Sequence, residues 1–260
     1  MITLQALTRD YGDLTAVDHV SLTVPEGQIL GYLGPNGAGK TTTVKMLTGL
    51  IQPTSGTATV AGFDICGQSL EVKRRIGYVP ESGALYQSLT PSEYLGFVGR
   101  LYGMEDEEAD AKINEICQFF RLETRMHDRI SEFSRGMRQK VVIASALIHN
   151  PMVIFLDEPL SGLDANTALM LKELIRNLAD EGKTIFYCSH ILEVVENLCD
   201  RVVIINNGSV AADGSVGELK EMTKKHSLED VFNQLTVDED LGELARAFSR
   251  KMSSGKGPSK

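Results

Sequence analysis

The 260-residue sequence contains no tryptophan and few cysteines and prolines, four and eight residues respectively. The cysteines are widely separated and form no C-x-x-C pair, which argues against a disulfide framework or a zinc site and indicates reduced thiols. The small number of prolines, together with 24 glycines and 42% hydrophobic residues, excludes collagen-like and mostly disordered chains. The composition therefore predicts a folded globular protein with a substantial core.

Long apolar runs and an excess of basic residues are also lacking. Residues 1–8 do not have the basic and apolar regions of a signal peptide, and the uncharged stretches 46–63 and 141–156 are interrupted by glycine, proline and polar residues. Neither stretch supplies the roughly 20 apolar residues that cross a bilayer, so we expect no membrane span. With 26 Lys and Arg against 35 Asp and Glu, the formal net charge is −9, which argues against nucleic acid as a partner.

Strand and helix patterns alternate along the chain, as in a parallel α/β sheet. The expected strands are 29–33, 57–60, 76–79, 153–156, 184–189, 201–205 and 209–213. The expected helices are 40–49, 90–102, 105–120, 138–148, 191–198 and 226–235, and one more that Asp164 caps and Gly182 ends. Helical patterns alone occupy the segment between the strands at 76–79 and 153–156, so the sequence predicts a helical insertion there.

Residues 34–41, GPNGAGKT, match the phosphate-loop pattern G-x-x-x-x-G-K-[ST] between an expected strand and an expected helix. Such a loop directs successive backbone N–H groups and the positive end of a helix at phosphate oxygens. Lys40 adds a point charge, and the Thr41 hydroxyl is a ligand for Mg²⁺. The expected nucleotide-binding residues of this segment are Asn36, Gly37, Ala38, Gly39, Lys40, Thr41 and Thr42. The alternative is an incidental glycine turn.

Two acids follow the apolar run 153–156, at the edge of the sheet where open α/β folds bind their ligands. We expect Asp157 to hold the Mg²⁺ shell and Glu158 to accept a proton from the attacking water or to orient it. The alternative is a pair of solvated carboxylates that close a strand.

In the segment 133–140, FSRGMRQK, Ser134 and the backbone at Gly136 precede the expected helix 138–148 and offer a hydroxyl and free N–H groups to an anion. With the phosphate loop and the acidic pair, it makes residues 2–235 resemble the nucleotide-binding subunit of an ATP-binding cassette (ABC) transporter. The family shows LSGGQ here. Ser134 and Gly136 match that motif, whereas Phe133, Arg135 and Met137 depart from it. The resemblance implies that Ser134 and Gly136 contact the γ-phosphate held by the opposite subunit.

The resemblance assigns four further residues. Asp164, in the segment 161–164, would lie in the loop that crosses the dimer seam, and His190 would bond the γ-phosphate and the water. Tyr11 would stack on adenine. Glu81 stands where the family usually has glutamine and would ligate Mg²⁺. The alternatives are a simple helix cap, a core histidine, a turn tyrosine and a solvated acid.

The resemblance also implies the fold and its parts: an α/β P-loop NTPase (RecA-like) parallel sheet core, an N-terminal antiparallel β subdomain and an inserted α-helical subdomain. The expected ABC nucleotide-binding domain is 1–222, with its core at 1–89 and 149–222 and its helical insertion at 90–148. A C-terminal helical extension, 223–249, and a disordered basic tail, 250–260, follow.

The implied function is that of an ATPase that converts ATP and water into ADP and phosphate, with Mg²⁺ as its cofactor. Two such subunits, identical or different, would close on ATP and drive a separate integral membrane permease, most simply for export, from the cytoplasmic face of the membrane. The helical insertion and the loop at Glu81 would dock on the permease. A soluble cassette ATPase without a transport role, a regulatory NTPase and an importer subunit remain alternatives.

Overall fold

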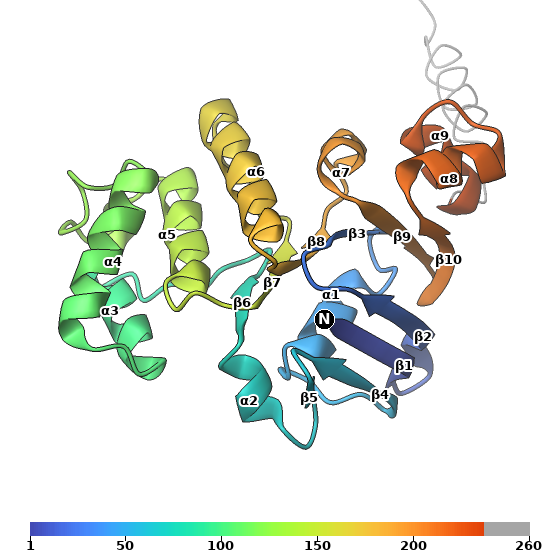
Figure 1. The fold of residues 1–260 in the computed structure, drawn as a ribbon, viewed down its shortest axis with the longest axis horizontal. Helices are drawn as coiled ribbons and strands as arrows, with labels where there is room; N and C mark the ends of the chain where they lie inside the picture. The colour runs from blue at the N-terminus through green and yellow to red at the C-terminus, as the bar shows by residue number, and fades with distance from the viewer. Residues whose placement is uncertain (237–260) are drawn as a thin grey trace, which may run out of the picture.

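The computed structural model describes residues 1–236 (Figure 1). Residues 237–260 lie outside the described part, and with them the predicted tail at 250–260 and the end of the predicted extension. Within residues 1–236, no helix combines the length and apolar character needed to cross a bilayer.

A small antiparallel sheet gathers the N-terminal strands in the order β2-β1-β4-β5. Its strands are β1 (Ile2–Tyr11), β2 (Leu14–Val24), β4 (Ser55–Val60) and β5 (Phe63–Asp64). Along β2, the side chains of Val20, Leu22 and Val24 are buried, whereas those between them are exposed, so one face of the sheet packs on the core and the other meets water. This sheet confirms the predicted antiparallel β subdomain.

The main sheet has the strand order β10-β9-β3-β8-β7-β6, and its neighbours are parallel except for β10 and β9. Its strands are β3 (Ile29–Leu33), β6 (Ile76–Val79), β7 (Val153–Asp157), β8 (Thr184–Cys188), β9 (Arg201–Asn206) and β10 (Ser209–Gly214). Every residue of β3, β7 and β8 is buried, because both faces of these strands are covered.

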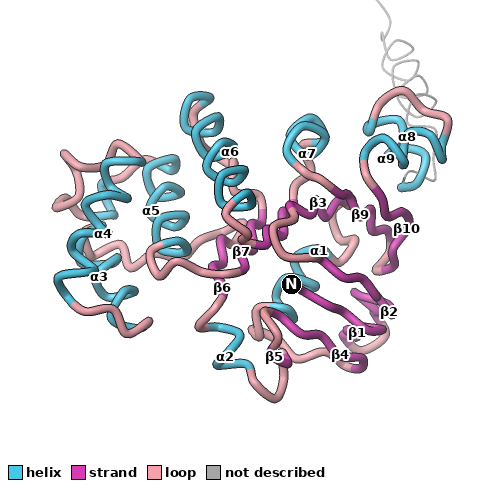
Figure 2. Tube along the Cα trace, in the orientation of Figure 1, coloured by secondary structure: helices cyan, strands magenta, loops and turns pink. Residues whose placement is uncertain are grey.

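Helices and the small sheet cover the main sheet, and the insertion lies beyond its β6 edge, where α5 packs on β6 (Figures 1 and 2). The insertion contains α3 (Pro91–Leu101), α4 (Asp106–Phe119), a short 3₁₀ helix (Ile130–Glu132) and α5 (Arg135–Leu147). The other helices are α1 (Lys40–Leu47), α2 (Ser69–Lys73), α6 (Ala165–Asp180), α7 (Leu192–Leu198), α8 (Val216–Thr223) and α9 (Leu228–Thr236). The strand β5 and the helix α2 were not predicted from the sequence.

Helix α5 begins three residues earlier than the sequence predicts, at Arg135 instead of Arg138. The Ser134 hydroxyl accepts a hydrogen bond from the backbone N–H of Met137 at 3.3 Å and therefore caps the helix. Gly136 consequently lies inside the first turn of α5 and does not precede the helix.

Close packing of α5 on β6 gives a test of stability at Gly77. A Cβ atom on Gly77 would lie 2.2 Å from the carbonyl oxygen of Ala146, a backbone atom of α5. We expect Gly77→Ala to lower the free energy of unfolding by about 1–3 kcal/mol, because backbone must shift to admit the methyl group. Denaturant unfolding of the purified chain measures this loss.

Gly217 provides the matched control. It lies in α8, and a Cβ atom there would have no heavy atom of the described residues within 4 Å. Gly217→Ala should raise the free energy of unfolding by up to about 1 kcal/mol, because alanine loses less conformational entropy in a helix. A Gly77→Ala chain as stable as the unmodified protein would contradict the packing described for α5.

Candidate functional site

A cavity of about 660 Å³ opens where the parallel strands end. Most of residues 34–42 line it, with Glu81, the pair Asp157 and Glu158, and His190. These groups meet because β3, β7 and β8 run parallel, so the residues that follow each strand reach the same edge of the sheet. Two apolar side chains, Ala16 and Phe232, complete the walls.

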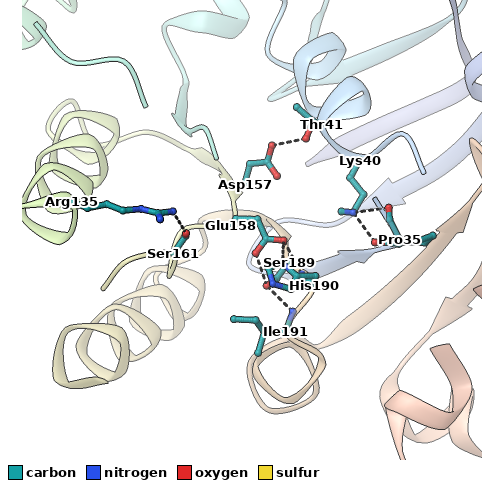
Figure 3. Close-up of polar contacts among 11 residues, drawn as sticks. Pro35, Lys40, Thr41, Arg135, Asp157, Glu158, Ser161, Ser189, His190 and Ile191 are labelled. Atoms are coloured by element: carbon teal, nitrogen blue, oxygen red, sulfur yellow. Dashed lines mark hydrogen bonds and ion pairs between the residues drawn. The ribbon is translucent and has the colours of Figure 1, made fainter. Parts of the chain in front are cut away.

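The phosphate loop joins β3 to α1. Gly39 has φ +104°, and a Cβ atom there would lie 2.3 Å from the carbonyl oxygen of Ala16, so only glycine fits this position. Helix α1 begins at the next residue, which turns the N–H groups of its first turn toward the cavity. The Lys40 ammonium donates hydrogen bonds to the carbonyl oxygens of Gly34 at 2.6 Å and Pro35 at 3.0 Å (Figure 3). The Lys40 side chain thus folds back over the phosphate loop and bonds its first two residues.

Oxygen ligands for a cation come together beside the loop. The Thr41 hydroxyl donates to Asp157 Oδ2 at 3.0 Å, and Glu81 lines the same cavity. Burial raises the pKa of the Asp157 carboxyl above its ordinary value, the bond from Thr41 opposes the rise, and the charge of Glu81 adds to it. The negative charges of Asp157 and Glu81 lie near the uncharged hydroxyl of Thr41, and a divalent cation bound there would neutralise them.

The donor set fits Mg²⁺. No group of three or more His, Cys, Asp or Glu side chains within residues 1–236 is arranged to bind a metal ion. Mg²⁺ does not require one, because it is usually held by one or two carboxylates together with water and phosphate oxygens. Thr41 and Asp157 supply such a partial shell, and Glu81 lies close enough for its charge to affect Asp157.

Glu158 is oriented by three hydrogen bonds (Figure 3). Its Oε1 accepts from the backbone N–H of His190 at 2.8 Å and from His190 Nδ1 at 2.7 Å, and its Oε2 accepts from the Ser189 hydroxyl at 3.1 Å. An ionised carboxylate only accepts, so Nδ1 carries the proton in this contact. The Glu158 backbone has φ +50°, a left-handed conformation uncommon for a residue with a side chain. This strained position follows the last residue of β7 and sends the carboxylate toward His190.

Ser189 is a site residue that the sequence reasoning missed. Its hydroxyl also accepts from the backbone N–H of Ile191 at 3.1 Å, so it links Glu158 to the residue directly before α7. Its position in the sequence, at the end of the expected strand 184–189 and directly before His190, could have indicated this role, because the residues at the end of that strand lie at the same edge of the sheet as Glu158.

Ser134, Gly136 and Asp164 lie outside the cavity, and the two segments that contain them contact each other. The Arg135 guanidinium donates to the Ser161 hydroxyl at 2.7 Å (Figure 3), and a Cβ atom on Gly136 would lie 2.7 Å from the carbonyl oxygen of Gly162. Asp164 caps α6, where its carboxylate accepts from the N–H and the hydroxyl of Thr167 at 3.0 and 2.7 Å. The start of α5 and the loop before α6 therefore form one packed surface.

Two further predicted site residues, Tyr11 and Ala38, do not line the cavity. Tyr11 lies at the end of β1 with 47% of its surface exposed, and the Arg9 guanidinium stands 4.6 Å from the centre of its ring. Ala38, within the phosphate loop, is 3% exposed because its side chain packs into the hydrophobic core. Phe232, which the sequence reasoning placed only in an amphipathic helix, does line the cavity.

The fold and the site together define a P-loop nucleoside triphosphatase, because a glycine loop before a helix faces a carboxylate pair at the end of a parallel strand. A family model described as ABC transporter matches residues 17–161. The chain therefore belongs to the ATP-binding subunits of ABC transporters, a family that hydrolyses ATP, and the resemblance drawn from the sequence is confirmed.

Similar proteins extend this assignment over nearly the whole described chain. The ABC transporter ATP-binding protein NatA of Bacillus subtilis is 43% identical over 238 residues, covering 89% of this chain and 96% of that protein. The Nod factor export ATP-binding protein I of Rhizobium meliloti is 38% identical over 213 residues, covering 82% of this chain and 64% of that protein.

Solved structures agree with the fold. An ATP-binding subunit of an ABC transporter superposes with a TM-score of 0.86 and 31% identity, covering 90% of this chain and 99% of that one. A dimeric ATP-binding cassette described as a post-hydrolysis state bound to ADP and Pi gives a TM-score of 0.76 and 25% identity, covering 83% of this chain and 98% of that one.

Proposed function

We propose that two copies of this chain, or this chain and a related one, hold ATP between them and hydrolyse it. The observation that carries this proposal is the separation of Ser134 and Gly136 from the cavity that contains Lys40 and Glu158. The start of α5 has the chemistry of an anion site, with a capping hydroxyl and helix N–H groups, but it does not reach the phosphate loop of its own chain. A second subunit brings such a helix to the cavity. The dimeric form of a related cassette supports this arrangement.

Within each cavity the residues divide the work of hydrolysis. The phosphate loop and Lys40 hold the phosphates, and Thr41 and Asp157 hold Mg²⁺, with Glu81 beside them. Mg²⁺, when bound, neutralises charge on the β- and γ-phosphate oxygens. Glu158 orients the attacking water and accepts its proton. Ser189 and His190 hold the Glu158 carboxylate in place, and the exposed ring of His190 is free to turn toward the γ-phosphate.

The coupled partner is proposed to be an integral membrane permease. The insertion and the loop before it expose apolar side chains at Tyr86, Phe97 and Leu101, of which Tyr86 and Phe97 contact each other edge to face. Loop residues 81–89 connect this surface directly to Glu81 in the cavity, so a permease segment seated there is placed to sense the γ-phosphate end. The location proposed for the chain is the cytoplasmic face of the membrane, as for the ATP-binding subunit of a transporter.

Export is the direction we propose, on the strength of relatives whose names state export, such as the Nod factor export protein. Co-purification from membranes under mild detergent tests the transport role. An integral membrane protein bound to this chain is expected, whereas ribosomes or DNA as the only bound material would contradict transport.

Ser134→Arg tests the dimer. A long cation at the start of α5 should block the approach of a second subunit, while ATP binding to the single chain remains, because Ser134 is not part of the cavity of its own chain. Light scattering of chains that also carry Glu158→Gln, with saturating ATP, measures the effect. We expect dimers without Ser134→Arg and monomers with it.

Ser215→Arg is the matched control, since the Ser215 hydroxyl caps α8 as Ser134 caps α5. Both changes remove a cap worth about 1 kcal/mol and add one positive charge. Dimerisation should survive Ser215→Arg. If ATP-driven dimers formed equally well with Ser134→Arg, the segment 133–137 would not meet the nucleotide of a partner.

A further inference from the structure

Helix α9, near the end of the described chain, contributes Phe232 to the wall of the cavity. The helix is firmly attached, because Leu228 and Val231 are fully buried in the core shared with the main sheet. Asn206, the last residue of β9, donates through its side-chain amide to the carbonyl oxygen of Leu235 at 3.2 Å. The half-buried ring of Phe232 is therefore held at the cavity by its helix and is not a loosely placed surface side chain.

The strand order locates Phe232 within the cavity. The phosphate loop follows β3, whose neighbours are β9 on one side and β8 on the other, with β7 and β6 beyond β8. Helix α9 packs on β9 and α7, and Figure 1 shows it on the opposite side of β3 from β6 and β7. Asp157 is the last residue of β7 and Glu158 follows it, whereas Glu81 follows β6. Phe232 thus occupies the side of the phosphate loop that lies away from the carboxylates.

Ala16, the other apolar residue of the cavity wall, lies on the same side of the phosphate loop as Phe232. Its carbonyl oxygen is 3.2 Å from where a Cβ atom of Gly208 would lie, and the backbone N–H of Asp18 donates to the carbonyl oxygen of Gly208 at 2.9 Å. Gly208 is in the turn between β9 and β10, next to the strand that contacts α9. The cavity therefore has a polar end at the carboxylates and an apolar end on the β9 side.

A nucleoside triphosphate fits a cavity with one polar and one apolar end in one orientation. The γ-phosphate must approach Glu158, and the phosphate loop holds the rest of the triphosphate, so the nucleoside leaves the loop away from the carboxylates. We propose that the Phe232 ring packs against the nucleoside of bound ATP, so that the C-terminal helix α9 forms part of the nucleotide site. This inference rests on the proposed ATPase function. Contact with an aromatic ring is tolerant of the base, because every base presents an apolar π-face.

Phe232→Ala is the variant that tests the inference. Binding of ATP, GTP and inorganic tripolyphosphate to the full chain, each with Mg²⁺, is measured by calorimetry. We expect Phe232→Ala to weaken ATP and GTP by about the same factor, on the order of tenfold, which is the scale of stacking one base on an aromatic side chain. Tripolyphosphate, which has no nucleoside, should bind as it does to the unmodified chain. Hydrolysis should show a raised KM for ATP with kcat unchanged.

Further variants separate nucleoside contact from support of the fold. Phe232→Tyr keeps the ring and should keep the affinity for ATP. Phe119→Ala removes an exposed phenylalanine of α4 and should leave the affinities for ATP, GTP and tripolyphosphate unchanged. Unchanged ATP affinity in Phe232→Ala would overturn the inference, as would an equal loss of affinity for tripolyphosphate, which would mean that Phe232 only supports the loop. Failure of the unmodified chain to bind ATP would instead overturn the proposed function.

Discussion

Glu158→Gln is expected to leave ATP binding nearly unchanged and to slow hydrolysis by about 10²- to 10⁴-fold, equivalent to roughly 3–5 kcal/mol of barrier. The amide fits the same contacts. Its oxygen can accept from the backbone and Nδ1 of His190, and its NH₂ can donate to the Ser189 hydroxyl, which has a free lone pair for that bond. The geometry is therefore kept, whereas the ability to take a proton from water is lost. Single-turnover hydrolysis with saturating ATP measures the change in the chemical step.

Glu193→Gln makes the same chemical change in the first turn of α7, at a residue that does not line the cavity. It should leave the rate unaltered and so controls for charge. If Glu158→Gln hydrolysed ATP at a near-normal rate, Glu158 would not be the general base, and the oriented carboxylate at the end of β7 would need another role.

Lys40→Ala is expected to weaken MgATP binding by about 10²-fold or more, the scale of removing one partner from a close charged contact. Among residues 1–236, the Lys40 ammonium bonds only the uncharged carbonyl oxygens of Gly34 and Pro35, so its positive charge is available to a phosphate. Alanine removes that charge and both bonds that brace the loop. Calorimetric titration with MgATP measures the loss directly.

Lys45→Ala is the matched control. Lys45 lies on the same helix α1, in its last turn, and is exposed to solvent away from the cavity. Both variants lose one positive charge from the same helix, yet only Lys40→Ala should lose affinity. Equal affinities of Lys40→Ala and the unmodified chain for MgATP would contradict the phosphate-loop assignment.

One departure of the segment 133–137 from LSGGQ, Arg135, has a structural role. Arg135, where the family has glycine, bonds Ser161 and packs over Gly162. Gln139, one turn further along α5, donates to the carbonyl oxygen of Pro159 at 3.1 Å. Helix α5 is thereby tied to the loop that leads from Glu158 to α6.

The sequence by itself determined the elements that depend on local patterns. The phosphate loop, the acidic pair and the cap at Asp164 were each placed correctly, because a glycine at a positive φ, an apolar run that ends in acids and a capping side chain are decided by neighbouring residues. The start of α5 was placed three residues late, since the cap that Ser134 provides competes with the breaking tendency of Gly136.

Only the tertiary structure decided which distant residues meet. Ser189 bonds Glu158 across 31 positions of the chain, and Phe232 lines the same cavity as the phosphate loop, 34–41. Neither contact has a periodicity or a motif, because each depends on the order of strands in the sheet and on where α9 packs. The order of the strands depends on the burial of apolar faces summed over the whole chain, so the sequence of a single segment does not determine it. The sequence thus fixes the chemistry of the phosphate end of the site, whereas the apolar end exists only once the sheet has assembled.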